Sequence, residues 1–391
     1  MAVERIEASK RGRAGRTGKV SILSSSSRTA LLVLFMSIVA QGMLDAQDIL
    51  NYQKKTVLDQ QEATMASVSD FCVLEDESFV ICDYKDNKIL VYDQNGHYLS
   101  GWKKQGQGPG EYQGIWFISY EPPDLAIADL RQPKILLYKR TDKGGFKWIK
   151  DIPESGRTIK DFVLRNEELY FETTILHDER FYSVHIRDLD AKHDEYLLPA
   201  AVRYGGRPED NHLKIYEAEY SKIWGKAYSF LDVLDGQIYS AWMGGLKVLK
   251  IDRQTKRWTS FGQITKNYRP LKLEKRKPAP GLTISQLFEH NRKEATRYSW
   301  VGGIFADQGL VGLLYITFNH AMSKWDVFLQ LYDQDGVFGR EFVLPDVIPV
   351  ETYLRCFYSH GSGSLYFLNM IDDDDKEIGF EILKYKINND E

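Results

Sequence analysis

Three aspartates interrupt short apolar segments of the chain and are the first candidates for chemistry. Asp70 stands in SDFCVL, Asp161 in KDFVL and Asp232 in SFLDVL. Carboxylates that converge in apolar surroundings can hold a cation, and calcium prefers such oxygen ligands. No histidine joins these segments, and Asp232 aligns poorly with the other two. The sequence leaves a metal site undecided: we expect no cofactor, and a calcium ion, if one binds, would use Asp70 and Asp161.

The densest run of charge is formed by the four aspartates at 372–375. Four carboxylates could hold calcium, which takes about six to eight oxygen ligands. The EF-hand spacing with its glycine and distal glutamate is absent, and consecutive residues cannot all face one ion. We interpret the run as a solvated loop whose charges repel one another.

Known catalytic motifs are absent from the sequence. It contains no nucleophile elbow, no HExxH, no Ser/His/Asp arrangement and no CxxC pair. The glycine-rich segment GQGPGEY (106–112) would cradle a phosphate if it opened a helix. However, the strand-like IWFISY follows it, and no lysine stands where a phosphate loop needs one. We predict no catalytic residue and interpret 106–112 as a rigid connector.

A repeat reveals the elements that position these residues. Residues 83–92 read DYKDNKILVY and residues 129–138 read DLRQPKILLY, which align at an offset of 46 residues. A step of about 40–50 residues that contains several short strands is typical of a β-propeller blade. VYDQNGHYL (91–99) and LYDQDGVFG (331–339) also echo each other. Both predict a tight hairpin with a residue at positive φ, as does Asp235-Gly236.

Six turn positions of this kind predict six blades. They fall near Asp93, Lys139, Asp188, Asp252, Asp333 and Tyr385. Two of the spacings between successive turn positions are longer than the others and indicate insertions near 200–226 and 262–299. In the second insertion, Thr283 with Gln286 predicts a short helix. The predicted fold over 47–391 is all-β, a six-bladed β-propeller with four-stranded antiparallel blades. We expect the strand at 49–59 to complete the last blade, because this closes the ring.

The segment 83–112 resembles an NHL-type repeat. It has a strand that ends in aspartate, Lys-Ile before an aromatic residue, Asp-x-x-Gly, and then Gly-x-Gly-Pro-Gly-Glu-aromatic. The whole pattern is similar to the bacterial exported six-bladed propellers related to the NHL and TolB-like families, with a good match in the first blade that weakens beyond about residue 160. The resemblance implies a six-bladed ring and surface binding. It implies no single chemistry, since propellers serve as binding platforms, lyases and lactonases.

Ligand candidates lie in the loops between the second and third strands of each blade, which share one face of a propeller. These loops are predicted at 83–88, 129–134, 173–181, 242–246, 318–325 and 370–378. The residues that we predict to bind a ligand there are Asp83, Asp129, Arg131, His177, Trp242 and His320. The alternative for Asp83 and Asp129 is that each accepts hydrogen bonds from its own loop backbone.

The first 46 residues predict export of the chain. Residues 1–28 are rich in arginine and lysine, ALLVLFMSIVA (30–40) is apolar, and small residues follow at Ala40, Gly42 and Ala46. This order is typical of a secretory signal, and the apolar run is short for a membrane span, which needs about 20 residues. We expect the remainder in the periplasm or outside the cell. The alternatives are a membrane anchor at 30–40 and a disordered basic tail.

Charge and cysteine content limit the partners. A net charge of −4 gives no general attraction to nucleic acid, so the expected partner is a protein, a glycan or a small molecule. Membrane contact is expected only through an uncleaved N-terminal segment. Cys72 and Cys82 lie on adjacent strands of one predicted hairpin and either bond to each other or form two small buried side chains. Cys356 has no partner in either case.

The sequence therefore predicts an exported binding module that presents a ligand- or protein-binding face at the channel mouth, with no catalysis evident. The alternative is a metal-dependent lactonase, another hydrolase or a lyase on the same scaffold. A third hypothesis is a structural module of an envelope complex, which would carry a large apolar patch on its rim.

Overall fold

The structure is a computed structural model, in which the chain divides into residues 1–49 and residues 50–391. It describes residues 49–154, 159–203, 228–271, 286, 289, 293–307, 309–349, 354–360, 362–371 and 379–388. The predicted signal at 1–46, the aspartate run at 372–375, Thr283, residues 204–226 of the first predicted insertion and half of the second lie outside these residues. Among the described residues, no helix is long and apolar enough to cross a membrane.

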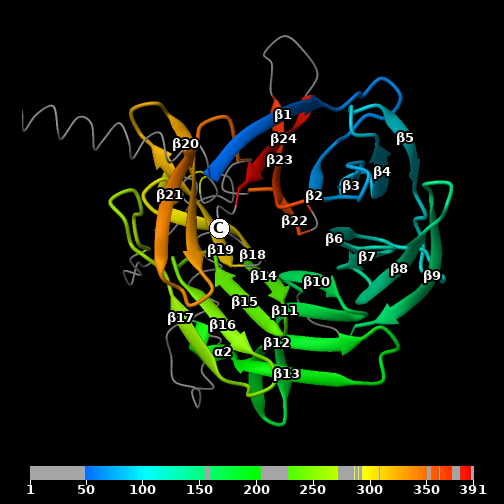
Figure 1. Ribbon diagram of the computed structural model, residues 1–391. Coiled ribbons are helices and arrows are strands. Elements are labelled where there is room, and N and C mark those ends of the chain that lie inside the picture. Colours follow the sequence, from blue (N-terminus) through cyan, green and yellow to red (C-terminus); the bar gives the residue numbers. More distant parts are fainter. Residues whose placement is uncertain are drawn as a thin grey trace, which may run out of the picture. The chain divides into compact units, whose positions relative to one another are not determined.

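The described strands form six four-stranded antiparallel sheets, which are the blades of a propeller (Figure 1). The first blade consists of β2 (Val68–Val73), β3 (Phe79–Asp83), β4 (Lys88–Tyr92) and β5 (Tyr98–Trp102). The second consists of β6 (Ile115–Glu121), β7 (Asp124–Asp129), β8 (Lys134–Arg140) and β9 (Phe146–Pro153). The third consists of β10 (Asp161–Arg165), β11 (Glu168–His177), β12 (Arg180–Asp188) and β13 (Asp194–Pro199).

The remaining three blades follow the same order. The fourth consists of β14 (Ser229–Leu234), β15 (Gln237–Trp242), β16 (Val248–Asp252) and β17 (Trp258–Phe261). The fifth consists of β18 (Ser299–Asp307), β19 (Leu310–Asn319), β20 (Lys324–Asp333) and β21 (Phe338–Leu344). The sixth consists of β22 (Cys356–Ser359), β23 (Ser364–Ile371), β24 (Gly379–Ile387) and β1 (Leu50–Val57). The prediction of six antiparallel blades is confirmed.

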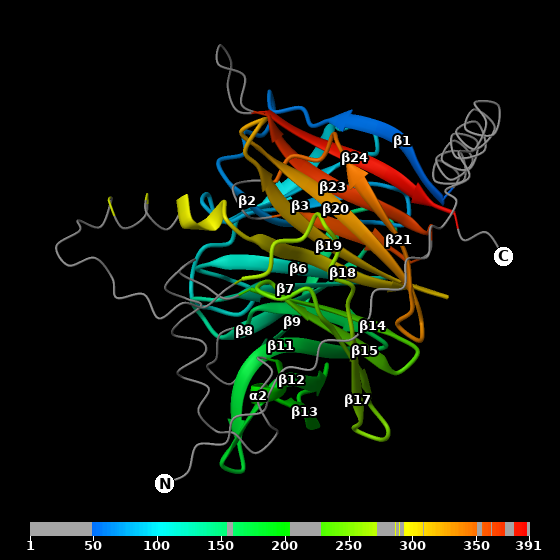
Figure 2. The ribbon, with the colours of Figure 1, turned by 90° about the vertical axis from the view of Figure 1, so that its left-hand side faces the viewer.

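The ring closes by joining the two ends of the propeller unit. β1 pairs antiparallel with β24, from Leu50 opposite Ile387 to Val57 opposite Glu381, and the two strands run together in both views (Figures 1 and 2). The backbone N–H of Leu58 continues the ladder by donating to the carbonyl oxygen of Phe380 at 2.9 Å. The strand predicted at 49–59 therefore completes the last blade and covers an edge that would otherwise be free to pair with another chain.

Large apolar side chains pack between neighbouring blades. One cluster joins Val80 and Ile89 of the first blade to Ile127 and Leu136 of the second. Tyr92 and Tyr138, which the 46-residue offset aligns, lie in the third strands of these blades and are both buried. The offset therefore corresponds to one blade, and the aromatic residues fill the space between sheets at close to crystalline density.

The predicted hairpins form as expected from their aspartates and glycines. Asp93 accepts hydrogen bonds from the N–H groups of Asn95 and His97, and Asp333 does the same in the fifth blade. Gly96 and Gly336 occupy the matching position at φ 88° and 84°, a backbone region that suits glycine. Residues 286, 289 and 293–295, within the segment predicted as a helix, are helical. The helix α2 (Ala200–Arg203) follows β13.

The register of the first blade decides the arrangement of the cysteines. Cys72 lies opposite Val80, and Cys82 lies opposite Asp70, so the two thiols are not cross-strand partners. Both are free and buried, and Cys356 is free as well. The structure therefore supports the interpretation of Cys72 and Cys82 as small core residues.

Candidate functional site

The innermost strands of the six blades surround a cavity of about 490 Å³. Asp70, Asp161 and Asp232 all line it, as do the basic residues Lys160, Arg165, Arg355 and His360. The three aspartates that the sequence marked out therefore do meet in one cavity, the central channel of the propeller.

Each of these aspartates bridges two neighbouring blades. One carboxylate oxygen accepts the N–H of the next residue, and the other accepts an N–H from the innermost strand of the following blade. Asp70 accepts from Phe71 and Ile118, both at 2.9 Å. Asp161 accepts from Phe162 at 2.9 Å and Leu231 at 2.8 Å. Asp232 accepts from Val233 at 2.8 Å and Ala306 at 2.7 Å. Between the second and third blades, the hydroxyl of Ser119 accepts the N–H of Leu164 at 2.9 Å. These bonds satisfy backbone donors that face the channel, where an unpaired donor would be costly.

The channel carboxylates differ in their pKa values. Burial raises the pKa of Asp70 to about 7, against the opposing effect of its two backbone hydrogen bonds. Burial also raises the pKa of Asp161 well above its ordinary value, and the nearby charges of Asp70 and Asp232 add to this. Burial acts in the same direction on Asp232, but the charge and hydrogen bond of His360, whose Nε2 lies 3.4 Å from the carboxylate, lower its pKa overall.

The same geometry bears on the predicted metal ligands. Both oxygens of Asp70 and of Asp161 already accept backbone hydrogen bonds. In the described part of the chain, no three His, Cys, Asp or Glu side chains are placed to hold a metal ion together. The channel carboxylates thus have a structural role that requires no ion, and the metal site stays a prediction.

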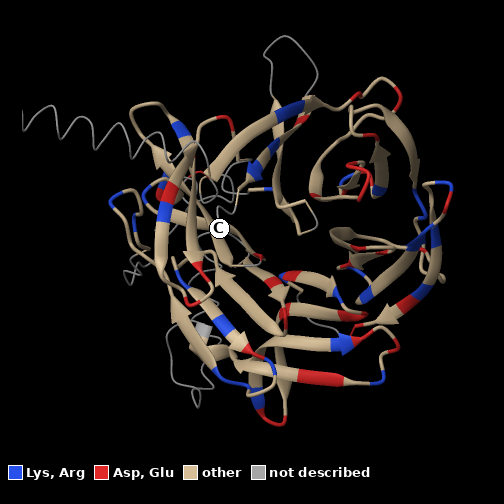
Figure 3. Cartoon of the chain, in the orientation of Figure 1, with Lys and Arg blue, Asp and Glu red and all other residues tan. Residues whose placement is uncertain are grey.

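Acidic side chains at the rim of the channel are paired with cations from neighbouring strands. Glu75 lies 2.9 Å from Arg140, and Glu77 lies 2.6 Å from Lys384. Both of these carboxylates are therefore neutralised within the protein. Over the whole ring, charged residues of both signs are interspersed (Figure 3).

A second cavity, of about 440 Å³, lies between the first and second blades. The loops at 84–87 and 130–131 and the connector from β5 to β6 form its walls. We call it the blade 1–2 cleft and define it by the residues that carry its chemistry, Tyr84, Lys85, Lys103, Gln105, Trp116 and Arg131. Two of the predicted ligand loops, 83–88 and 129–134, thus meet at one hollow.

An aromatic pair lines one side of the cleft. The rings of Tyr84 and Trp116 lie 4.6 Å apart between centroids and are tilted by 46°. Tyr84 is 38% exposed and Trp116 is partly buried, so the pair has accessible surface. Aromatic surface of this kind contributes binding energy at a small cost in conformational entropy.

Three exposed cations surround this pair. Lys85, Lys103 and Arg131 all line the cleft, and within the described ranges no carboxylate forms an ion pair with any of them. The one acidic residue of the cleft, Asp86, is 3.0 Å from Lys88 outside it. The hydrogen bond from Lys88 lowers the pKa of Asp86, and the charges of Lys103 and Lys85 lower it further. The cleft therefore has an excess of positive charge.

Asp83 and Asp129 hold the loops of the cleft in place. Asp83 is fully buried and accepts the N–H groups of Ala66, Ser67 and Asp86. Asp129 is equally buried and accepts the N–H groups of Gln113, Gly114, Arg131 and Gln132. The structure thus gives both residues the loop-capping role that was the alternative to ligand binding. It is their exposed neighbours, Tyr84, Lys85 and Arg131, that face the cleft.

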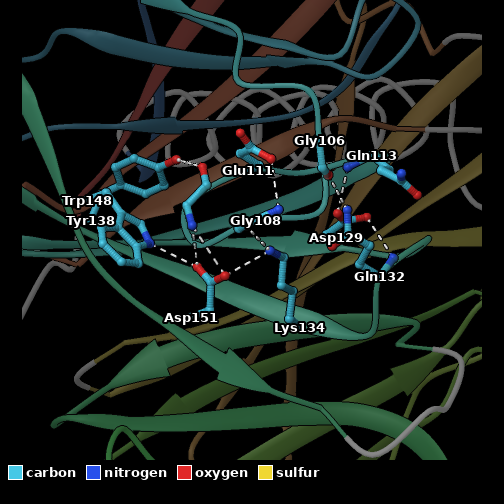
Figure 4. Close-up of polar contacts among 11 residues, drawn as sticks. Gly106, Gly108, Glu111, Gln113, Asp129, Gln132, Lys134, Tyr138, Trp148 and Asp151 are labelled. Carbon is cyan, nitrogen blue, oxygen red and sulfur yellow. Dashed lines mark hydrogen bonds and ion pairs between the residues drawn. The ribbon is translucent and has the colours of Figure 1, made fainter.

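The glycine-rich connector is fixed by its own Glu111 and by side chains of the second blade (Figure 4). The N–H of Gly108 donates to Glu111 at 2.8 Å, and the N–H of Gly110 donates to Asp151 at 3.1 Å. Lys134 donates to the carbonyl oxygen of Gly108 at 3.2 Å and to Asp151 at 2.8 Å. The segment is a rigid connector, as predicted, and it holds one wall of the cleft.

The other predicted ligand residues lie elsewhere on the ring. His177 stacks on Tyr196 at 4.1 Å in the third blade, and His320 contacts Phe318 edge-on at 5.1 Å in the fifth. Trp242, in the fourth blade, is only 8% exposed because it packs against the turn that contains Gly244. None of the three lines the blade 1–2 cleft.

Sequence reasoning did not assign Lys85, Lys103, Gln105 or Trp116 to a site. The available signal was the run WKKQ at 102–105, which places two cations next to the glycine-rich connector. In the sequence, Trp116 is one of several large apolar residues in the predicted strand IWFISY. Its place beside Tyr84 depends on how closely the first two blades approach, which the sequence does not show.

Comparison with known proteins supports the fold. A family described as "6-bladed beta-propeller" matches residues 55–217. A solved structure of a DUF4221 family member from Bacteroides vulgatus is similar, with a TM-score of 0.55 and 11% identity over 88% of this chain and 100% of that one. A protein from Bacteroides fragilis, provisionally named as exported, is similar with a TM-score of 0.53 and 12% identity over 88% of this chain and 96% of that one. No curated protein matches the chain.

The protein is a six-bladed β-propeller. At these identities, the likeness to bacterial structures concerns the fold alone, and function has to be argued from the sites of this chain.

Proposed function

We propose that the protein is a binding module whose ligand occupies the blade 1–2 cleft. The observation that carries this proposal is the combination of the Tyr84–Trp116 pair with three cations that form no ion pair in the described structure. Cavities with a few convergent polar groups on an apolar floor are the usual binding sites of proteins. The buried caps Asp83 and Asp129 preorganise both loops, which reduces the entropy lost on binding.

Binding rather than catalysis suits the groups in the cleft. Lys85, Lys103 and Arg131 are cations, and Gln105 is neutral. The carboxylate of Asp86 has a lowered pKa and is paired with Lys88, so it is a poor proton carrier near neutral pH. The cleft offers charge, hydrogen bonds and aromatic surface, which hold a ligand without changing it.

The test is a screen of the full-length, fluorescently labelled chain against printed arrays of glycans and small metabolites. Tyr84→Ala should reduce the signal of each bound compound by about ten-fold or more, since central aromatic contacts dominate binding energy. The matched control is Tyr52→Ala, which removes an exposed tyrosine that packs edge-on against Tyr385 in the sixth blade. If Tyr84→Ala and Tyr52→Ala reduced the signal equally, or if neither reduced it, the cleft would not be the binding site.

Export and membership of the NHL or TolB-like type are further parts of the proposal. The basic segment followed by ALLVLFMSIVA supports export, and the similar Bacteroides fragilis protein is provisionally named as exported. N-terminal sequencing of the protein from its native cells tests this. A mature chain that begins after about residue 46 is expected, whereas an intact Met1 on protein in the cytoplasmic fraction would refute it.

The channel supports a second candidate, a metal-dependent hydrolase or lyase. The observation in its favour is His360 beside Asp232 at the wall of the 490 Å³ cavity. Elemental analysis of the purified chain, together with hydrolase and lyase assays of the wild type and of His360→Ala and Asp161→Asn, decides between the candidates. A stoichiometric metal whose loss in Asp161→Asn abolishes activity would favour the enzyme.

A further inference from the structure

We infer that the blade 1–2 cleft binds an acidic oligosaccharide, a short sugar chain that carries carboxylate or sulfate groups. This inference rests on the proposed function and names the ligand class of the same site. It follows from three properties of the cleft: its aromatic surface, its cations, and its side-chain amides.

The aromatic pair suits the face of a sugar ring. The rings of Tyr84 and Trp116 are tilted by 46° to each other and leave accessible surface on the side of the cleft. The C–H groups on one face of a pyranose form an apolar surface that packs against such rings, while the hydroxyl groups at the edge point to solvent or to polar side chains. An open cleft of about 440 Å³ has room for part of a chain that continues beyond it.

The cations supply the charge selectivity. Lys85, Lys103 and Arg131 are exposed, and the only acid in the cleft is paired with Lys88. An anionic ligand therefore gains three attractive interactions and displaces no internal partner of these cations. A neutral sugar would leave this excess positive charge uncompensated.

The amides suit a ligand rich in hydroxyl groups. Gln105 and Gln113 line the cleft, and within the described residues their side chains make no hydrogen bond. A carboxamide both donates and accepts, which matches the two roles of a sugar hydroxyl. By contrast, the amide of Gln132 already donates to the carbonyl oxygen of Gly106.

A compact phosphate compound fits the cleft less well. Phosphate sites are usually built from converging backbone N–H groups. In this connector, those of Gly108, Gly110, Gln113 and Gly114 already donate to Glu111, Asp151 and Asp129. The remaining cations sit on long, exposed side chains, which suit charges spread along a chain better than one concentrated anion.

Titration of the full-length chain with defined oligosaccharides tests this inference. The probes are an oligogalacturonate, a sulfated galactan oligosaccharide of similar length and a neutral maltohexaose, in low salt. At least one acidic probe should bind at least ten-fold more tightly than the neutral one, and its affinity should fall as salt increases. Comparing the two acidic probes shows whether carboxylate or sulfate is the preferred anion.

Variants link the binding to the cleft. Lys85→Ala, Lys103→Ala and Arg131→Ala should each weaken binding of the acidic probe about five-fold, which corresponds to an exposed charge contact. The matched control is Lys143→Ala, an exposed lysine in the turn between β8 and β9, which should leave the affinity unchanged. Loss of binding in the Lys143→Ala control to the same extent would mean that net charge, rather than the cleft, attracts the probe.

Three results would overturn the ligand class. Equal affinity for maltohexaose, with dependence on Tyr84 but not on the cations, would replace the acidic sugar by a neutral one and leave the binding function intact. Tighter binding of ATP or of polyglutamate, lost in the same variants, would assign the cleft to a nucleotide or to an acidic peptide. No binding of either acidic probe at millimolar concentration would refute the inference, while the array screen would still test the cleft itself.

Discussion

At the scale of single residues, aspartates fix the architecture more than they form a site. Asp83 and Asp129 collect loop N–H groups, and Asp70, Asp161 and Asp232 collect N–H groups across blade boundaries. The sequence shows these aspartates clearly as the polar exceptions in apolar segments. It cannot show which N–H groups they accept, because half of the donors come from other loops or from the next blade.

The raised pKa of Asp70 predicts an unusual pH dependence. Burial raises this pKa to about 7, so the folded chain keeps a proton that the unfolded chain releases above about pH 4. The free energy of unfolding should therefore fall as pH rises from about 5 to 7, by at most about 1.4 kcal/mol per pH unit from this group, and level off above pH 7. Urea unfolding at several pH values should show a smaller fall in Asp70→Asn. An unchanged slope would mean that Asp70 does not titrate in this range.

The loop-capping role of Asp129 predicts that its side chain contributes strongly to stability. Its carboxylate accepts four backbone N–H groups, from the connector and from the loop that carries Arg131. Asp129→Ala should lower the free energy of unfolding by about 3 kcal/mol, because buried donors lose their acceptor. Asp335→Ala, in an exposed turn, should change it by less than about 0.5 kcal/mol. Equal denaturation midpoints for the two variants would contradict the assigned role.

At the scale of elements, the repeat predicted the strands and turns because each depends on local residues. The hairpins at Asp93 and Asp333 formed as their aspartates and glycines indicated, and the strand at 49–59 joined β24. The register that keeps Cys72 and Cys82 from facing each other was not predictable. The pairing places Cys72 opposite Val80 and Cys82 opposite Asp70, and it depends on the turn between β2 and β3 and on a bulge between Val68 and Asp70.

A glycine pair tests the contact between a turn and the closing strand. A Cβ at Gly96 would lie 2.0 Å from the carbonyl oxygen of Val57, whereas a Cβ at Gly144 would meet nothing within 4 Å. Both glycines have positive φ, at 88° and 80°, so alanine strains the backbone similarly at the two positions. Gly96→Ala should lower the thermal midpoint by several degrees more than Gly144→Ala, as followed by circular dichroism. Equal shifts would show that the turn does not pack on the end of β1.

At the scale of the whole molecule, the ring determines which predicted residues can act together. The sequence predicted that loops from all six blades would converge on one ligand face. In the structure, a ring of six sheets keeps His177 and His320 on separate blades, and the hollow forms between two adjacent blades. Arg131 is the one predicted ligand residue exposed in that hollow, with Asp83 and Asp129 as its buried supports. The sequence therefore predicted which loops carry ligand residues. It did not predict the spacing between the first two blades, which creates the cleft.

The most direct test of the central claim is hydrogen exchange of the full-length chain, with and without a saturating amount of the compound that gives the strongest array signal. If the ligand occupies the cleft, peptides that cover 84–87, 103–107 and 130–132 should exchange more slowly, and Tyr84→Ala should abolish the effect. Peptides of the channel wall at 161–165 and 356–360 should exchange as they do without ligand. Protection confined to the channel peptides would place the ligand among Asp70, Asp161 and Asp232 and contradict the cleft as the binding site.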